Sequence, residues 1–314
     1  MIARIGVAAE NPAEADPVET EPAMDVVLVT GYYSGPAMWK VKSGDNVMWI
    51  VGEISPLPQK LKWKSKEFEQ LLRKSQELLI DFSGYWLADE GNSNALNKAA
   101  RLQDGVRLKD VISPELHARV LETAEKFGKP DLESMRPFAA TNRLVRSAMK
   151  SMDLSSFSVR FTAAKLGEWR KKKITYYATN ELPFEDRLKN WQDPSNEVCL
   201  KRLVDAIGDG GEGVMNLANA WAVGDIGALR ELVPLYSFSR DGFRSGACAA
   251  AMHGGEQRAR EYQEKRIQGW VAEAERALKK NRSTVAVVLM SELFEQDGYL
   301  AALRAKGYEI VEPE

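Results

Sequence analysis

The sequence predicts an α/β fold in which buried strands near both ends of the chain enclose a long, mostly helical middle. Two nearly continuous apolar runs, at residues 47–51 and 284–290, are typical of strands that are buried on both faces. Between them, residues 86–245 show mainly helical periodicity. With 314 residues, of which 44% are hydrophobic, the chain is long enough to bury a sizeable core.

The N-terminal third begins with a leader at residues 1–35, which is acidic and contains several prolines, a composition typical of flexible segments. Its first residues are either the remnant of an export signal or a plain disordered start. Residues 38–51 predict a β-hairpin, because the turn-forming run Ser43-Gly44-Asp45-Asn46 separates two apolar strands. A helix beginning at Ser65 and a buried strand at 78–82 follow.

The helical middle and the C-terminal end are marked by start and stop signals. Ser113-Pro114 predicts a helix start and Gly128-Lys129-Pro130 predicts its end, while residues 173–177 predict one strand among the helices. The expected C-terminal elements are a long charged helix at 256–280, a buried strand at 284–290, a short helix over Leu300 and Leu303, and an edge strand at 308–311.

Composition excludes several classes of function. Lys and Arg number 43 against 45 Asp and Glu, and no basic stripe is interleaved with aromatic residues, so nucleic acid is not an expected partner. No apolar run approaches the roughly 18 residues that a transmembrane helix needs. The two histidines, His117 and His253, lie in no catalytic motif, so a histidine-rich metal site or a serine–histidine nucleophile is not expected.

Two segments at opposite ends of the chain resemble the motif strands of the TraB/GumN family, which is related to the Tiki-type metalloproteases. The first runs from Pro36 to Ser55, and the second is Val285 to Leu293, followed by Asp297-Gly298 and Gly307-Tyr308. In that family each segment is a strand that ends in a G-x-x-H turn, and the two histidines meet at a metal. The resemblance implies that both ends pair in one mixed central sheet, as a single domain over residues 36–314, with the helical middle as an insertion that covers the motif end.

This sequence departs from the family pattern at both histidines. The resemblance assigns Gly52 and Ser55 to the first turn and Ser291 and Glu292 to the second, so a serine and a glutamate stand where histidines are expected. A neutral hydroxyl is a poor ligand for the divalent metals that imidazole binds well. The resemblance also assigns Asp81 as the site carboxylate and Arg266, with Trp270, to a weaker motif on the last long helix.

Three carboxylates, Glu53, Asp81 and Glu292, follow strands that are expected to be neighbours, so they can converge on one ion. Such a cluster favours the oxygen-preferring ions Mn²⁺, Ca²⁺ or Mg²⁺. The alternative is that Glu53 and Glu292 face solvent or pair with basic residues. The candidate catalytic residues are therefore Glu53, Ser55, Asp81 and Glu292, and the candidate metal ligands are Glu53, Asp81 and Glu292.

Two functions follow from the resemblance. One is a divergent member without metal-dependent hydrolase activity, which acts as a binding or scaffold protein of the bacterial envelope for a peptide or protein ligand. The other is a peptidase-like, metal-dependent hydrolase with a carboxylate-rich site. The resemblance also implies a periplasmic or secreted location. In that setting Cys199 and Cys248 pair as a disulfide, whereas the alternative is two separate buried thiols.

Overall fold

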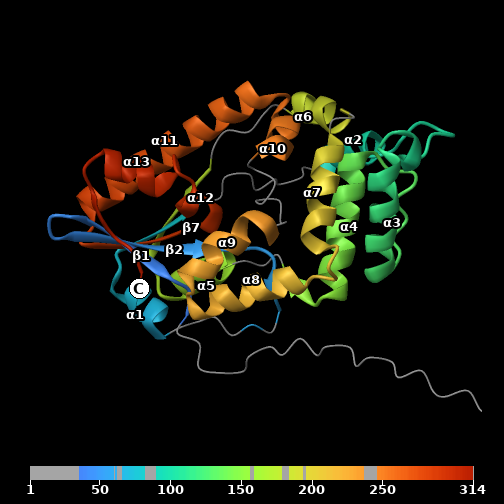
Figure 1. Ribbon diagram of the computed structural model, residues 1–314. Helices are drawn as coiled ribbons and strands as arrows, with labels where there is room; N and C mark the ends of the chain where they lie inside the picture. The colour runs from blue at the N-terminus through green and yellow to red at the C-terminus, as the bar shows by residue number, and fades with distance from the viewer. Residues whose placement is uncertain are drawn as a thin grey trace, which may run out of the picture.

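A computed structural model describes residues 35–59, 61, 66–81, 90–155, 159–178, 184–193, 196–236 and 246–313. Apart from Gly35, the expected leader lies outside these residues. The protein has the predicted α/β fold, with a mixed six-stranded sheet at its centre and a separate two-stranded sheet (Figure 1). The strands are β1 (Met38–Ser43), β2 (Asn46–Glu53), β3 (Leu57–Pro58), β4 (Glu77–Asp81), β5 (Leu154–Ser155), β6 (Lys173–Tyr177), β7 (Ser283–Leu289) and β8 (Glu309–Val311).

The two ends of the chain pair in one sheet, as predicted. The strand order is β6-β4-β7-β2-β1-β8, so the C-terminal strand β7 lies between the N-terminal strands β4 and β2. Both of its pairings are parallel, and Val287 of β7 lies opposite Val51 of β2 and Ile80 of β4. β6 adds a further parallel strand, while β1 runs antiparallel to β2 and β8.

Burial explains why the central strands are apolar runs without alternation. All five residues of β4 are buried, as are the last six residues of β7, because helices cover both faces of the sheet. The predicted hairpin of β1 and β2 is confirmed, with Gly44 in its turn at φ 58°. That positive φ is a conformation that glycine adopts without a steric penalty.

Figure 1 shows that α11 and α13 cover one face of the sheet, while α1 and α5 cover the other. A group of helices that includes α3, α4 and α7 lies beyond the carboxyl end of the parallel strands (Figure 1). The helices are α1 (Lys66–Lys74), α2 (Glu90–Ala99), the 3₁₀ helix η1 (Leu108–Asp110), α3 (Pro114–Lys126), α4 (Pro137–Ser151), α5 (Val159–Trp169), α6 (Phe184–Trp191), α7 (Glu197–Ile207), α8 (Glu212–Val223), α9 (Ile226–Tyr236), α10 (Gly246–His253), α11 (Glu256–Lys280), α12 (Met290–Phe294) and α13 (Tyr299–Ala305).

Helix boundaries follow the expected signals. Ser113 is the N-cap of α3, and its hydroxyl accepts a hydrogen bond from the backbone N–H of Leu116 at 3.3 Å. The same helix ends at Lys126, two residues before the predicted stop at Gly128. The long charged helix has the predicted bounds, and Trp270 and Leu278 are buried on its inner side.

Buried apolar side chains form two clusters. The larger cluster surrounds the six-stranded sheet, and the smaller one joins α3, α4 and α7. Tyr236 at the end of α9 packs against both. Among the helices in the described part of the chain, none is both long enough and apolar enough to cross a membrane.

Candidate functional site

The parallel strands bring the candidate residues to one edge of the sheet. β2 ends at Glu53 and β4 ends at Asp81, while β7 ends at Leu289 and leads directly into α12, which carries Glu292. Because parallel strands share a direction, their carboxyl ends meet at the edge where open α/β sheets usually place ligand sites. All three carboxylates are almost completely buried, at 1–2% exposure.

Glu53 is held by the first turn of α5. The guanidinium of Arg160 forms a buried ion pair with one carboxylate oxygen, and the backbone N–H of Arg160 donates to the other at 3.0 Å. A carboxylate at a helix N-terminus is also stabilised by the helix dipole. Glu53 therefore receives both a full positive charge and a backbone hydrogen bond from a single residue.

Glu292 and Asp81 belong to a second network, which is centred on Arg266 of α11. Nη2 of Arg266 donates to Oε2 of Glu292 at 2.6 Å, and Nη1 donates to the hydroxyl of Tyr299 at 3.2 Å. The Tyr299 hydroxyl in turn donates to Oδ2 of Asp81 at 2.7 Å. The ring of Tyr299 stacks on Trp270, with centroids 4.2 Å apart, which fixes the phenol between the arginine and the aspartate.

The charges in this network strengthen one another. Burial alone would lower the pKa of Arg266, but the negative charges of Glu292 and Asp81 raise it well above its usual value. Burial, with the nearby charge of Asp81, also raises the pKa of Tyr299 well above that of a free tyrosine. Arg266 is therefore a permanent cation, and Tyr299 is a neutral hydrogen-bond donor at any physiological pH.

The remaining motif positions shape the backbone around these networks. The carbonyl of Gly52 accepts a hydrogen bond from Nε1 of Trp221 at 2.8 Å, and a Cβ on Gly52 would lie 2.6 Å from Sδ of Met290. A side chain at this position would therefore force the buried Met290 side chain of α12 to shift. Ser55 is buried and precedes Pro56 through a cis peptide bond, and the carbonyl of Ser291 accepts from the N–H of Glu295.

Glu295, at the end of α12, lies beside the Arg266 network. Its carboxylate accepts a hydrogen bond from the amide of Gln263. Burial, together with the charge of Glu292, raises the pKa of Glu295 to about 7. A pocket of about 310 Å³ opens next to it, and it is lined by Arg260, Gln263, Glu264, Ile267, Gln268 and Asp297.

The three candidate metal ligands reach neighbouring strand ends, but each is engaged by a different protein group: Glu53 by Arg160, Glu292 by Arg266, and Asp81 by Tyr299. Within the described ranges, no group of three or more His, Cys, Asp or Glu side chains is arranged to hold a metal ion. The two histidines are elsewhere, with His117 bonded to Glu133 and His253 at the end of α10. In this arrangement guanidinium groups supply the positive charge that the carboxylates require.

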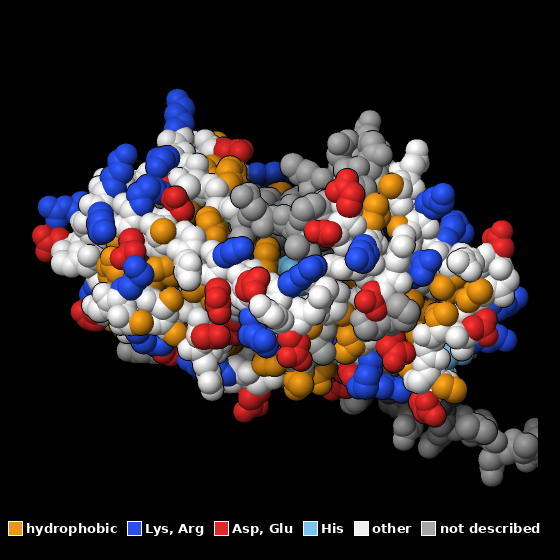
Figure 2. Space-filling model, turned by 90° about the horizontal axis from the view of Figure 1, so that it is seen from above, with side chains coloured by type: hydrophobic (Ala, Val, Ile, Leu, Met, Phe, Trp, Pro, Cys, Tyr) orange, Lys and Arg blue, Asp and Glu red, His pale blue; other side chains and the backbone are white. Residues whose placement is uncertain are grey.

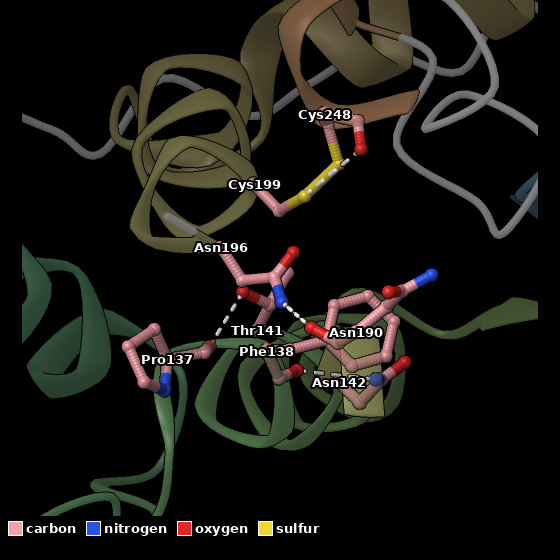
Figure 3. Close-up of a disulfide and its surroundings, with 8 residues drawn as sticks. All are labelled: Pro137, Phe138, Thr141, Asn142, Asn190, Asn196, Cys199 and Cys248. Atoms are coloured by element: carbon pink, nitrogen blue, oxygen red, sulfur yellow. Dashed lines mark hydrogen bonds between the residues drawn. A yellow bond between two sulfur atoms is a disulfide. The ribbon is translucent and has the colours of Figure 1, made fainter. Parts of the chain in front are cut away.

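The two cysteines form a disulfide between α7 and α10, inside the smaller hydrophobic cluster (Figure 3). Beneath it, the side-chain amide of Asn196 donates to the carbonyl of Asn190, which ties the start of α7 to α6 (Figure 3). The disulfide is therefore part of the helical group and lies apart from the carboxylate networks.

Sequence reasoning missed three participants in the site: Arg160, Tyr299 and Glu295. A weak signal existed for Arg160, which is a single arginine between Val159 and Phe161 at the start of an apolar helix. Tyr299 directly follows Gly298 in the flank of the second motif, but nothing local distinguishes it from a core tyrosine. The role of Arg160 depends on Glu53, 107 positions away in the sequence, and that of Tyr299 depends on Asp81, 218 positions away.

The fold and the site together define a class of protein. It is an α/β protein whose central parallel strands come from opposite ends of the chain and carry buried carboxylates where they end. The TraB/PrgY/gumN family model matches residues 37–312, most of the chain, and the chain belongs to this family. No curated protein and no solved structure matches it significantly.

Proposed function

We propose that this TraB/PrgY/gumN family member is a binding or scaffold protein that does not hydrolyse its ligand. The observation that carries the proposal is the internal neutralisation of the carboxylates at the motif strand ends. An arginine pairs with Glu53 and another with Glu292, and both pairs are buried. A metal ion that replaced these contacts would leave two guanidinium charges buried without partners, which is strongly unfavourable.

The proposed ligand is a peptide or a protein segment. The pocket beside Glu295 supports this, because Gln263 and Gln268 offer amide groups that both donate and accept hydrogen bonds, as a peptide backbone requires. Arg260 and Asp297 add one charge of each sign to the pocket lining. These groups are suited to orienting a polar chain, whereas none of them is a nucleophile with an adjacent base.

The proposed location is the periplasm or the cell exterior. The disulfide between Cys199 and Cys248 supports it, because such bonds form and persist mainly in oxidising compartments. Expression with an export signal, followed by thiol labelling of the denatured protein, measures the oxidation state. An exported protein that kept two free thiols would contradict this part of the proposal.

The main test is the metal content of the purified protein, combined with thermal melts in Mn²⁺, Co²⁺, Zn²⁺, Ca²⁺ and Mg²⁺. We expect no stoichiometric ion, no melting shift and no cleavage of a mixed peptide library. The competing function, a hydrolase with a carboxylate metal site, predicts a bound ion and a melting shift that Glu292→Gln abolishes. Glu115→Gln, at an exposed position of α3, is the matched control for that variant.

A further inference from the structure

The opposite edge of the sheet carries a cluster of cations that the fold does not neutralise. At this edge β4, β6 and β7 begin and three helices, α1, α5 and α11, end. Figure 2 shows Lys and Arg side chains gathered at the end of the molecule where α11 finishes, at the left of the view. We use the name basic end for the surface formed by Arg73, Lys74, Trp169, Lys171, Lys172 and Lys280.

Contacts between the elements show that this surface is continuous. Nζ of Lys172 donates to the backbone carbonyls of Arg73 and Ser75, at 2.7 and 2.6 Å, which joins the turn after α5 to the end of α1. Glu77 connects the turn to α11, because it pairs with Lys173 at 2.9 Å and with Arg276 at 2.5 Å. These contacts link the ends of α1 and α5, on one face of the sheet, to the end of α11 on the other face.

All but one of the carboxylates named here are already engaged. Besides Glu77, the acidic residues pair with cations outside the basic end: Glu69 with Arg170, Glu273 with Arg276, Glu275 with Lys306 and Asp45 with Arg282. Glu168 is the exception, because it is exposed and forms no ion pair among the described residues, so its charge offsets one of the cations. Within the described part of the chain, Arg73, Lys74, Lys171 and Lys280 form no ion pair with a carboxylate, and all four are exposed. The whole chain has a net charge of −2, so the excess of cations is local.

Trp169 sets this surface apart from an ordinary solvated helix end. Its side chain is 74% exposed, and the guanidinium of Arg170 lies 5.0 Å from its ring centroid. Cations in the last turn of a helix stabilise the helix dipole, which accounts for some of the lysines. Stabilising a helix dipole does not require an exposed indole ring. Burying the large apolar ring of Trp169 would have stabilised the folded state, so its exposure needs another explanation.

We propose that the basic end docks on the surface of a membrane rich in anionic lipids. Clusters of four to eight Lys and Arg are attracted to the negative surface potential of such membranes. Tryptophan favours the boundary between headgroups and hydrocarbon, because its ring is apolar and its N–H is polar. A flat lipid surface can contact three neighbouring helix ends at once, whereas a nucleic acid is usually followed by a groove lined with several stacking aromatics.

This inference goes beyond the proposed function, because it uses no residue of the carboxylate networks. The docked orientation would turn the carboxyl edge of the sheet, and the pocket beside Glu295, away from the bilayer. A ligand could then reach the pocket from the aqueous side while the protein stays at the membrane.

The test is flotation of the full chain with vesicles of equal parts phosphatidylcholine and phosphatidylglycerol, and with vesicles of phosphatidylcholine alone. We expect binding to the anionic vesicles only, and weaker binding as salt shortens the range of the attraction. Lys74→Glu combined with Lys171→Glu should weaken partitioning by roughly tenfold or more. Trp169→Ser should weaken it while leaving the charge unchanged.

Arg146→Glu combined with Lys150→Glu is the matched control, because it makes the same charge change at exposed positions of α4. Equal losses in the two double variants would overturn the proposal, as would unchanged binding by the Lys74/Lys171 variant. A third outcome would identify a nucleic-acid surface instead. In that case wild type binds a random DNA duplex but not the vesicles, and the Lys74/Lys171 variant no longer binds the duplex. Circular dichroism of each variant verifies folding, and the metal and cleavage assays report on the proposed function separately.

Discussion

Arg160 and Arg266 explain how this chain keeps buried carboxylates near the carboxyl ends of its parallel strands. A carboxylate in a protein interior needs a positive charge and hydrogen bonds, because burial without them is very costly. Arginine supplies both, since its planar guanidinium carries several donors and does not lose its proton. In Glu292, Arg266 has a partner of opposite charge at 2.6 Å.

The pair of Arg266 and Glu292 should behave as a buried ion pair in unfolding experiments. Arg266→Met leaves the glutamate buried without a counter-charge, so the free energy of unfolding should fall by about 3–5 kcal/mol. Arg266→Met combined with Glu292→Leu removes both charges and should recover most of that loss. Urea denaturation of the three proteins measures this, and equal losses in the single and double variants would show that the pairing is not the cause.

Glu295 should make stability depend on pH near neutrality. Its pKa is about 7 in the folded protein, above the ordinary value of 4.5, so the folded state holds more protons than the unfolded state between these values. Stability should therefore fall as pH rises from about 4.5 to about 7, by at most about 1.4 kcal/mol per pH unit. Glu295→Gln should flatten this dependence in urea melts, and an unchanged slope would assign it to another group.

At the scale of elements, Glu77 joins four segments at the start of the parallel strands. Its carboxylate accepts hydrogen bonds from Arg276 of α11, from Lys173 and Thr175 of β6, and from Asn281 before β7. Burial would raise the pKa of Glu77, but these hydrogen bonds outweigh it and lower the pKa to about 2. Glu77 therefore links β4 to β6, to α11 and to the segment before β7 at the edge of the sheet opposite the site.

The lowered pKa of Glu77 predicts a loss of stability in acid. The folded pKa is below the ordinary 4.5, so the stabilisation is complete above pH 4.5 and is lost as pH falls toward 2. At pH 7, Glu77→Gln should lower the free energy of unfolding by roughly 3 kcal/mol. The variant should also lose less stability than wild type between pH 4.5 and 3, and parallel pH curves would contradict the assignment.

At the scale of the whole molecule, the disulfide and the sheet stabilise different parts of the protein. Cys199 and Cys248 lie in the smaller hydrophobic cluster, and the bond spans 49 positions of the chain. Constraining a loop of that length in the unfolded state is worth roughly 4 kcal/mol. The central strands belong to the larger cluster, and the disulfide does not cross-link them.

Replacing both cysteines by serine should therefore loosen the helical group first. Hydrogen exchange followed by mass spectrometry should show faster exchange in α3, α4 and α7, with little change in β2 and β7. Exchange that rises equally in the sheet would mean that the two clusters unfold as one unit. A separate fluorescence melt reports whether global stability falls by the expected amount.

Local patterns were enough to predict most of the elements. The hairpin around Gly44, the start of α3 at Ser113 and the long helix α11 follow from turn chemistry, capping and periodicity, which act over a few residues. The motif resemblance correctly predicted that the two ends of the chain pair in one sheet. The sequence left two alternatives open for Glu53 and Glu292: convergence on one ion, or solvent exposure or pairing with basic residues. It could not decide between them, because both arginine partners come from distant helices.

The sequence by itself determined the fold class, the strands that are buried and, through the family resemblance, the positions Ser55 and Glu292 at which histidines were expected. Only the tertiary structure decided which charges meet. Arg160 reaches Glu53, and Arg266 reaches Glu292, through packing between segments far apart in the chain. The physical reason is that secondary structure follows from local backbone preferences, whereas electrostatic pairing depends on distances that exist only after folding.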